Sequence, residues 1–183
     1  QTKNVVVTAI NDALDENDLP ISIYFGPATS SDIRFNGNSN SLPFTIKDND
    51  MANLIVSAIS GNLREGGINA HFTIVLQAQP THSVTIDLTS SNTAEAILSI
   101  STFIFTDQNW NTPKTVTVNS VDDGIIDGDI SLTVNGTVTT NDLNYQVLLF
   151  PAVNVLNVDD EVPAIVVSIP DPTVSEAGKT TSA

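Results

Sequence analysis

The chain has 183 residues and no cysteine, and six Lys plus Arg stand against 21 Asp plus Glu, for a formal net charge of −15. This charge argues against nucleic acid and anionic membrane surfaces as partners, because both repel an acidic protein. Without cysteine, neither a disulfide framework nor a thiolate metal site is available. The longest apolar run, at about 147–153, is too short to cross a bilayer, so we expect no membrane insertion in this segment.

The sequence repeats itself at a long spacing. Residues 3–12 return as 114–123, a shift of 111 positions (114 − 3). At the same shift, the acidic triplet Asp48-Asn49-Asp50 returns as Asp159-Asp160-Glu161 (159 − 48). Such a unit is far longer than a solenoid repeat, so each copy should be a domain with its own core.

These correspondences divide the chain into three parts. We expect 1–50 to be the C-terminal half of a preceding repeat, 51–160 a complete repeat, and 161–183 the first strand of the next repeat. Both ends are then expected to be cuts in a longer polypeptide, and the neighbouring repeats are the first expected partners.

Alternation of apolar and polar residues predicts short β-strands throughout the complete repeat, with Gly, Pro, Asn and Asp between them. In chain order the expected strands are 53–59, 69–78, 82–89, 97–106, 114–121, 130–137 and 147–157. Seven strands in about 110 residues match an immunoglobulin-like sandwich in size and strand count. We therefore predict an all-β protein of tandem antiparallel β-sandwich repeats, immunoglobulin-like with about seven strands each.

Two aromatic residues are expected to be structural. Trp110, the only tryptophan, precedes the fifth expected strand and should pack at one end of the sandwich. Tyr145, matched by Phe35 in the preceding copy, should fix a loop to the sheet.

An acidic loop follows the fifth expected strand. Residues 122–129 hold four carboxylates, Asp122, Asp123, Asp127 and Asp129, separated by two glycines that let the loop curl. Unpaired, these charges repel one another, and a hard cation would relieve the repulsion. Ca²⁺ takes six to eight oxygen ligands and tolerates irregular geometry, although the spacing here is not that of an EF-hand.

Two further acidic segments are expected to join this loop. If the strands run up and down, the loop lies at the same pole as Asp159-Asp160-Glu161, which ends the last strand, and Glu65, which follows the first strand. The next repeat begins at that pole. The preceding copy has acids at the corresponding places, in 11–18 and 48–50.

Over nearly its whole length, the sequence resembles the Calx-beta family, a calcium-binding sandwich found in sodium–calcium exchangers and large bacterial surface proteins. The residues that carry the likeness are Val174 to Gly178, matched by Leu63 to Gly67 in the complete copy, Val121 to Asp123, and Val155 to Glu161. The stretch 105–118 looks like the bacterial adhesin version of such repeats. Each short motif alone has modest specificity.

The resemblance implies a calcium cluster with ligands carried over by position. These residues are Glu65, Asp122, Asp123, Asp127, Asp159 and Asp160, with Asp129 as a further member. The chain departs from the family at 91–94, Ser-Asn-Thr-Ala, where an amide replaces the usual Asp. Asp87 and Glu95 lack the support of the repeat, and Asp87 is expected to point outward from its strand.

Catalysis is not expected. His71 and His82 have no acidic or cysteine partner at a metal-ligand spacing, and no Gly-x-Ser-x-Gly elbow or phosphate-binding glycine loop occurs.

We therefore predict a calcium-binding structural repeat of an extracellular or cell-surface protein, acting as a stiffened spacer in adhesion or cell-surface architecture. A surface receptor or the matrix is a further candidate partner. Three alternatives stay open: a carbohydrate- or protein-receptor-binding module, an accessory domain of a secreted enzyme, and a strand-exchanging filament subunit.

Overall fold

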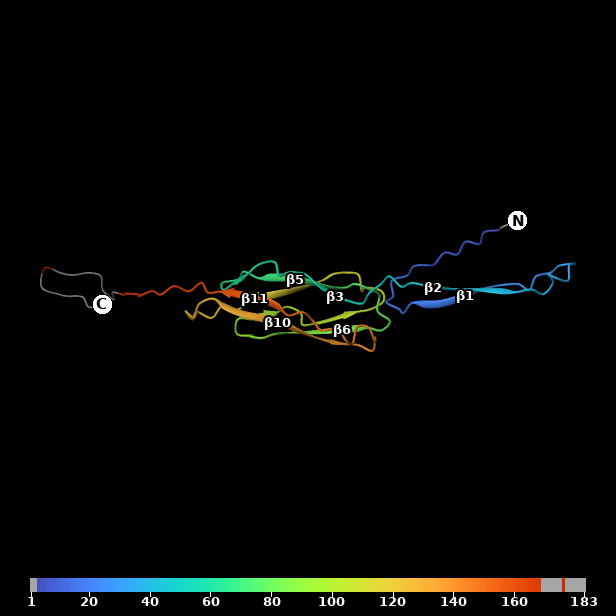
Figure 1. Cartoon of the computed structure of the whole chain (residues 1–183). Helices are drawn as coiled ribbons and strands as arrows, with labels where there is room; N and C mark the ends of the chain where they lie inside the picture. Colours follow the sequence, from blue (N-terminus) through green and yellow to red (C-terminus); the bar gives the residue numbers. More distant parts are fainter. Residues whose placement is uncertain (1–2, 169–175, 177–183) are drawn as a thin grey trace.

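The structure, a computed structural model, describes residues 3–168 and 176, and over these residues it is all-β with no helix (Figure 1). The strands are β1 (Leu19–Phe25), β2 (Asn40–Ile46), β3 (Leu54–Val56), β4 (Leu63–Arg64), β5 (Ala70–Leu76), β6 (Val84–Ser90), β7 (Ala96–Leu98), β8 (Thr102–Phe105), β9 (Lys114–Ser120), β10 (Ile130–Thr139) and β11 (Val153–Val158). No helix among these residues is long and apolar enough to cross a membrane.

Strands β3 to β11 form two sheets that enclose one apolar core. The five-stranded sheet has the order β4-β11-β10-β6-β8, and the four-stranded sheet has the order β3-β5-β9-β7. Alternate residues of β5 are buried, from Ala70 to Leu76, as expected for a strand with one face on a core. All pairs are antiparallel except β4 with β11, which run parallel.

The prediction of one strand at 97–106 is wrong, because the chain changes sheets there. β7 pairs with β9 and β8 pairs with β6. The switch is visible in the backbone hydrogen bonds: Ser99 donates to Thr117 at 3.0 Å, whereas Ser101 accepts from Leu88 at 2.7 Å. A continuous apolar alternation does not show which sheet each half joins.

Two other strand predictions need correction. β4 was not predicted, because it is only two residues long, yet Leu63 within it is fully buried. The last strand begins at Val153 and not at residue 147, since a turn, with Leu148 donating to the Tyr145 carbonyl, and Pro151 precede it. Proline has no N–H to give to a sheet.

The predicted anchoring by Tyr145 is confirmed. Its hydroxyl donates to the Ala78 carbonyl at 2.6 Å and accepts from the Ala78 amide at 3.1 Å, and the side chain is buried. Trp110 is partly buried against the core. Phe35, the counterpart of Tyr145 in the preceding copy, is exposed.

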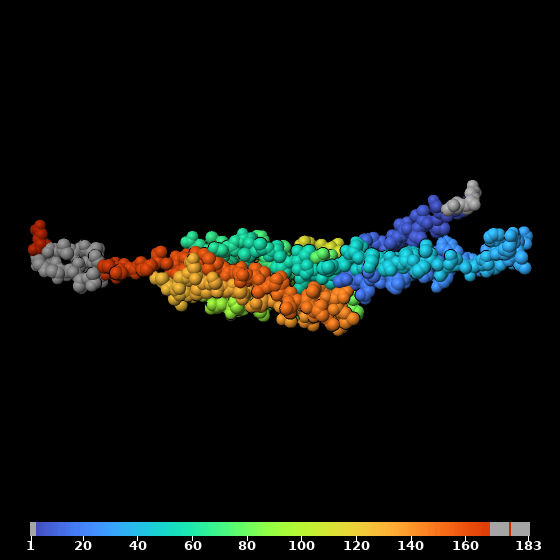
Figure 2. All heavy atoms as spheres, viewed as in Figure 1, coloured from blue at the N-terminus to red at the C-terminus, as the bar shows by residue number. Residues whose placement is uncertain are grey.

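The first copy contributes a hairpin whose register repeats that of the sandwich. Leu19 of β1 faces Ile46 of β2, and Ile130 of β10 faces Asn157 of β11, so both partners shift by the same 111 positions (130 − 19 and 157 − 46). The hairpin extends from one end of the sandwich, and residues 161–168 leave from the opposite end (Figure 2).

Residues on either side of these elements do not form the strands expected of them. Residues 3–9 correspond to β9 by the same shift of 111 but lie in no sheet. Residues 161–168 form no strand, and most of the strand expected in 161–183 lies outside the described residues.

Candidate metal centre

The parallel pairing of β4 with β11 brings Glu65 to the acidic end of the last strand. Leu63 faces Asn157 and Arg64 faces Val158, and the Glu65 amide then donates to the Val158 carbonyl at 3.1 Å. Glu65 therefore lies beside the segment that follows β11, although 94 positions separate it from Asp159 in sequence (159 − 65).

Two glycines after Glu65 make this approach possible. Gly66 and Gly67 have φ values of +77° and +111°, which other residues adopt at a cost. A Cβ atom on Gly66 would lie 2.9 Å from Oδ2 of Asp160, so the Asp160 carboxylate would have to shift to make room for it. The glycine thus provides the turn and also the space for the Asp160 carboxylate.

The pairing of β7 with β9 brings a second glutamate to the same pole. Ala96 faces Ser120, and the Val121 amide donates to the Glu95 carbonyl at 2.9 Å. Glu95 therefore lies beside the loop that begins at Asp122.

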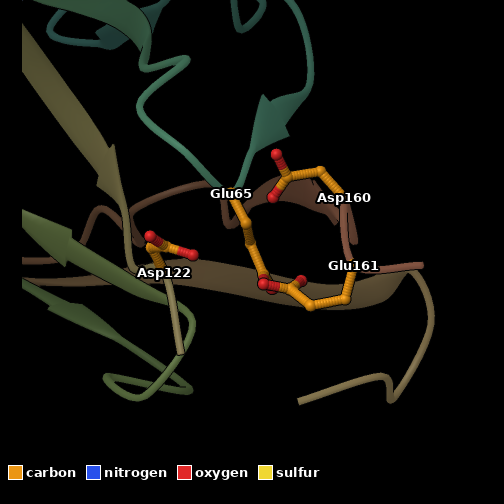
Figure 3. Close-up of side chains that lie close together, drawn as sticks. All are labelled: Glu65, Asp122, Asp160 and Glu161. Carbon is orange, nitrogen blue, oxygen red and sulfur yellow. The ribbon is translucent and has the colours of Figure 1, made fainter. Parts of the chain in front are cut away.

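Carboxylates gather at this pole in two groups. The first acidic group consists of Glu65, Asp122, Asp160 and Glu161, and the second of Glu95, Asp123 and Asp127. In each group, one oxygen of every residue lies within 4.8 Å of the others. Figure 3 shows the carboxylates of Glu65 and Glu161 pointing toward each other, with Asp122 and Asp160 on either side.

Several oxygens of the pole are buried without a partner. Glu65 is only 4% exposed, and its Oε2 atom has no hydrogen-bond donor. Oε2 of Glu161 is also buried without a partner. Buried polar atoms normally have a partner, so these oxygens mark a place where a cation would supply the missing interaction.

Asn157 lies between the two acidic groups. It is 1% exposed, and its Nδ2 donates to Glu65 Oε1 at 3.2 Å, to Glu95 Oε2 at 3.0 Å and to the Glu95 carbonyl at 3.2 Å. The three acceptors fix the orientation of the amide, because a flipped amide would turn its oxygen toward them. Its Oδ1 atom is then buried without a partner.

The crowding of carboxylates raises two pKa values. Burial, the adjacent Glu161 carboxylate and the charges of Asp123 and Glu95 raise the pKa of Glu65 to about 7. The adjacent Asp159 carboxylate, together with burial, raises the pKa of Glu161. A bound cation would oppose both effects by favouring the ionised form.

Asp159 and Asp129, both expected as ligands, lie outside the two acidic groups. Asp159 accepts hydrogen bonds from the Gly128 amide at 2.9 Å and the Glu161 amide at 3.0 Å. These amides hold its pKa below 3.8. Asp129 accepts from the Asp159 amide at 3.3 Å. The two residues tie the acidic loop to the end of β11, and so position other carboxylates.

The other five expected ligands fall in the groups, in two separate places. Glu65, Asp122 and Asp160 belong to the first acidic group, and Asp123 and Asp127 to the second. Sequence reasoning did not assign Glu95, Glu161 or Asn157 to the site. Glu161 stood within the acidic triplet, whereas only the pairing of β7 with β9 reveals Glu95. Asp87 is exposed, as expected, and accepts a hydrogen bond from Thr102.

The donor set fits a hard cation. Both groups offer only carboxylate oxygens, the ligands that Ca²⁺ and Mg²⁺ prefer. Among the described residues, the ion pairs are Arg34 with Asp32 and Lys47 with Asp18, so no basic side chain there neutralises either group.

Comparison with known proteins does not identify a family for this chain. No family model matches the sequence, and no curated protein matches it, so the Calx-beta likeness stays a prediction. Among solved structures, the chain is similar to domains 4 and 5 of the S-layer protein SbsC, at 20% identity and a TM-score of 0.35. The match covers 66% of this chain and 58% of that one.

Proposed function

We propose that this chain is a calcium-binding structural repeat of an extracellular or cell-surface protein, serving as a spacer that calcium stiffens. The observation that carries the proposal is the burial of unpartnered oxygens of Glu65, Glu161 and Asn157 at a pole crowded with carboxylates. The Calx-beta resemblance supports the same choice of ion.

Calcium suits this pole better than magnesium. The carboxylates come from separate segments, and an irregular set of oxygens suits the flexible coordination of Ca²⁺, whereas Mg²⁺ demands a tight octahedron. Extracellular calcium modules bind with a Kd of about 10⁻⁴ to 10⁻³ M, and we place this site in that range. The ion would draw together β4, the acidic loop and the end of β11, where the next repeat begins.

The test compares the melting temperature of the chain in calcium and in chelator. An ion that binds only the folded state stabilises it by about 2.7 kcal/mol at 100 times its Kd. We therefore expect a clear rise in melting temperature when calcium is added. Small-angle scattering should show that the chain is less extended in chelator than in calcium, as a shift of its intramolecular distances to shorter values.

Two variants make the test specific. Glu65→Gln removes a buried carboxylate of the first acidic group, and should abolish most of the rise. Asp107→Asn removes an exposed carboxylate from the turn before β9, whereas the acidic loop follows the other end of β9, and this variant should leave the rise intact. An equal rise in both variants, or no rise in the unmodified chain, would eliminate the proposal.

A further inference from the structure

The acidic loop of the first copy touches the complete repeat. This loop, 11–18, corresponds to 122–129 by the same shift of 111 (122 − 11). At its tip, the Ala13 carbonyl accepts a hydrogen bond from the Gln79 amide at 2.7 Å, and Leu14 forms a parallel β-bridge with Gln79. The loop therefore extends the backbone bonding of one copy into the next.

Asp15 adds two more bonds across the same junction. Its Oδ2 accepts from the Ala52 amide at 2.7 Å, and its carbonyl accepts from Nδ2 of Asn144 at 2.7 Å. Ala52 precedes β3, Gln79 follows β5, and Asn144 lies in the turn after β10. One loop tip thus holds three separate segments of the complete repeat.

The burial of the two equivalent tips differs accordingly. Residues 13–15 are half-buried, whereas their counterparts 124–126 in the complete repeat are exposed. Ile125 and Ile126 are 58% and 55% exposed, which is unusual for two successive isoleucines in an otherwise polar loop. The loop tip is thus covered in the first copy, where the complete repeat follows it and packs against it.

The residues at the two ends of the Asp15–Ala52 bond change together in the next copy. At the 111 shift, Ile126 replaces Asp15 and Pro163 replaces Ala52 (126 − 15 and 163 − 52). Isoleucine has no acceptor and proline has no N–H, so the polar pair is exchanged as a whole for an apolar pair. A single replacement would leave a donor or an acceptor without its partner.

We propose that the tip of this loop, residues 13–15 here, is a docking surface that sets the orientation of one repeat on the next repeat of the same chain. The bond from the Ala52 amide to the Asp15 carboxylate anchors it, and a charged acceptor strengthens such a bond. The surface extends the proposed spacer role, but it needs no cation, because all its contacts are made by the chain itself.

The experiment follows the junction in the full chain, in chelator, with two readouts. The first is the hydrogen exchange of the Ala52 and Gln79 amides. The second is the distance distribution between two spin labels, one at Ser22→Cys on the hairpin and one at Thr89→Cys on the sandwich. The chain has no cysteine of its own, so the labels attach only at these two introduced residues. Asp15→Ala should speed exchange at Ala52 about tenfold and broaden the distribution.

Matched variants separate docking from other effects. Ile126→Ala changes the equivalent position of the other loop and should alter neither readout, and Asp15→Asn, which keeps an acceptor, should retain the narrow distribution. If Asp15→Ala also weakens the protection of the core amide of Ile74, the variant has destabilised the whole sandwich. Asn144→Ala then tests the junction instead, because it removes the hydrogen bond that the complete repeat donates to the Asp15 carbonyl. An unchanged distribution in both Asp15→Ala and Asn144→Ala would overturn the proposal. A failure of calcium binding would leave these measurements in chelator untouched.

Discussion

Asn157 separates two groups of like charges with a neutral donor. Its amide bonds a glutamate of each group, so it offsets part of their repulsion without adding charge. In the preceding copy Ile46 takes this place (157 − 46, a shift of 111), and that copy cannot form the same bridge.

Replacement of Asn157 should therefore destabilise the chain even without calcium. In Asn157→Leu the buried carboxylates of Glu65 and Glu95 lose their donor, which should lower the free energy of unfolding in chelator by about 1–3 kcal/mol. Asn154→Leu is the matched control, because Asn154 is exposed on the same strand. Urea denaturation measures both, and equal stabilities for the two variants would show that the bridge contributes nothing.

The raised pKa of Glu65 predicts an unusual dependence of stability on pH. Between pH 4.5 and about 7, the unfolded chain releases the Glu65 proton while the folded chain retains it, so this residue makes unfolding easier as pH rises. Its penalty is complete above about pH 7. The lowered pKa of Asp159 has the opposite effect on stability, and it does so at lower pH: there the free energy of unfolding increases as pH rises.

Urea denaturation in chelator from pH 5 to pH 8 tests this expectation. Over this interval the free energy of unfolding should fall more in the unmodified chain than in Glu65→Gln, because only the unmodified chain has the Glu65 carboxyl to ionise. The difference between the two pH profiles is the contribution of that carboxyl. Calcium affinity should increase over the same interval, because the ion displaces the proton. Parallel pH profiles for the two chains would contradict the assignment.

At the scale of elements, the turn after β4 sets the geometry of the first acidic group. Gly66→Ala would place a Cβ atom against Asp160 in a left-handed conformation that costs about 1–2 kcal/mol. We expect a weaker calcium affinity, measured by calorimetry. Gly61→Ala is the control, because a Cβ atom there meets nothing within 4 Å. Equal affinities in the two variants would show that the turn does not shape the site.

The strands show which parts of the fold the sequence could predict. The fifth and sixth expected strands match β9 and β10 closely, because their apolar residues alternate over their whole length. The switch between β7 and β8 and the short β4 depend on long-range pairing, which periodicity does not contain. The carboxylates and glycines of the acidic loop, with its recurrence in the preceding copy, predict its place in the site, whereas Glu95 joins the site only through the β7–β9 pairing.

At the scale of the whole molecule, repulsion among 21 acidic residues should make stability depend on salt. In chelator, sodium chloride should raise the melting temperature by screening the acidic pole. With saturating calcium the same salt should have a smaller effect, since the ion already neutralises part of that charge. Thermal unfolding across a salt series checks this, and an identical salt dependence with and without calcium would contradict it.

The central claim is that segments distant in sequence gather their carboxylates around a bound cation. A crystal structure of the full chain grown in calcium, with an anomalous difference map, tests it most directly. We predict a peak coordinated by oxygens of Glu65, Asp122, Asp160 and Glu161. A map with these side chains ordered and no peak among them would contradict the account.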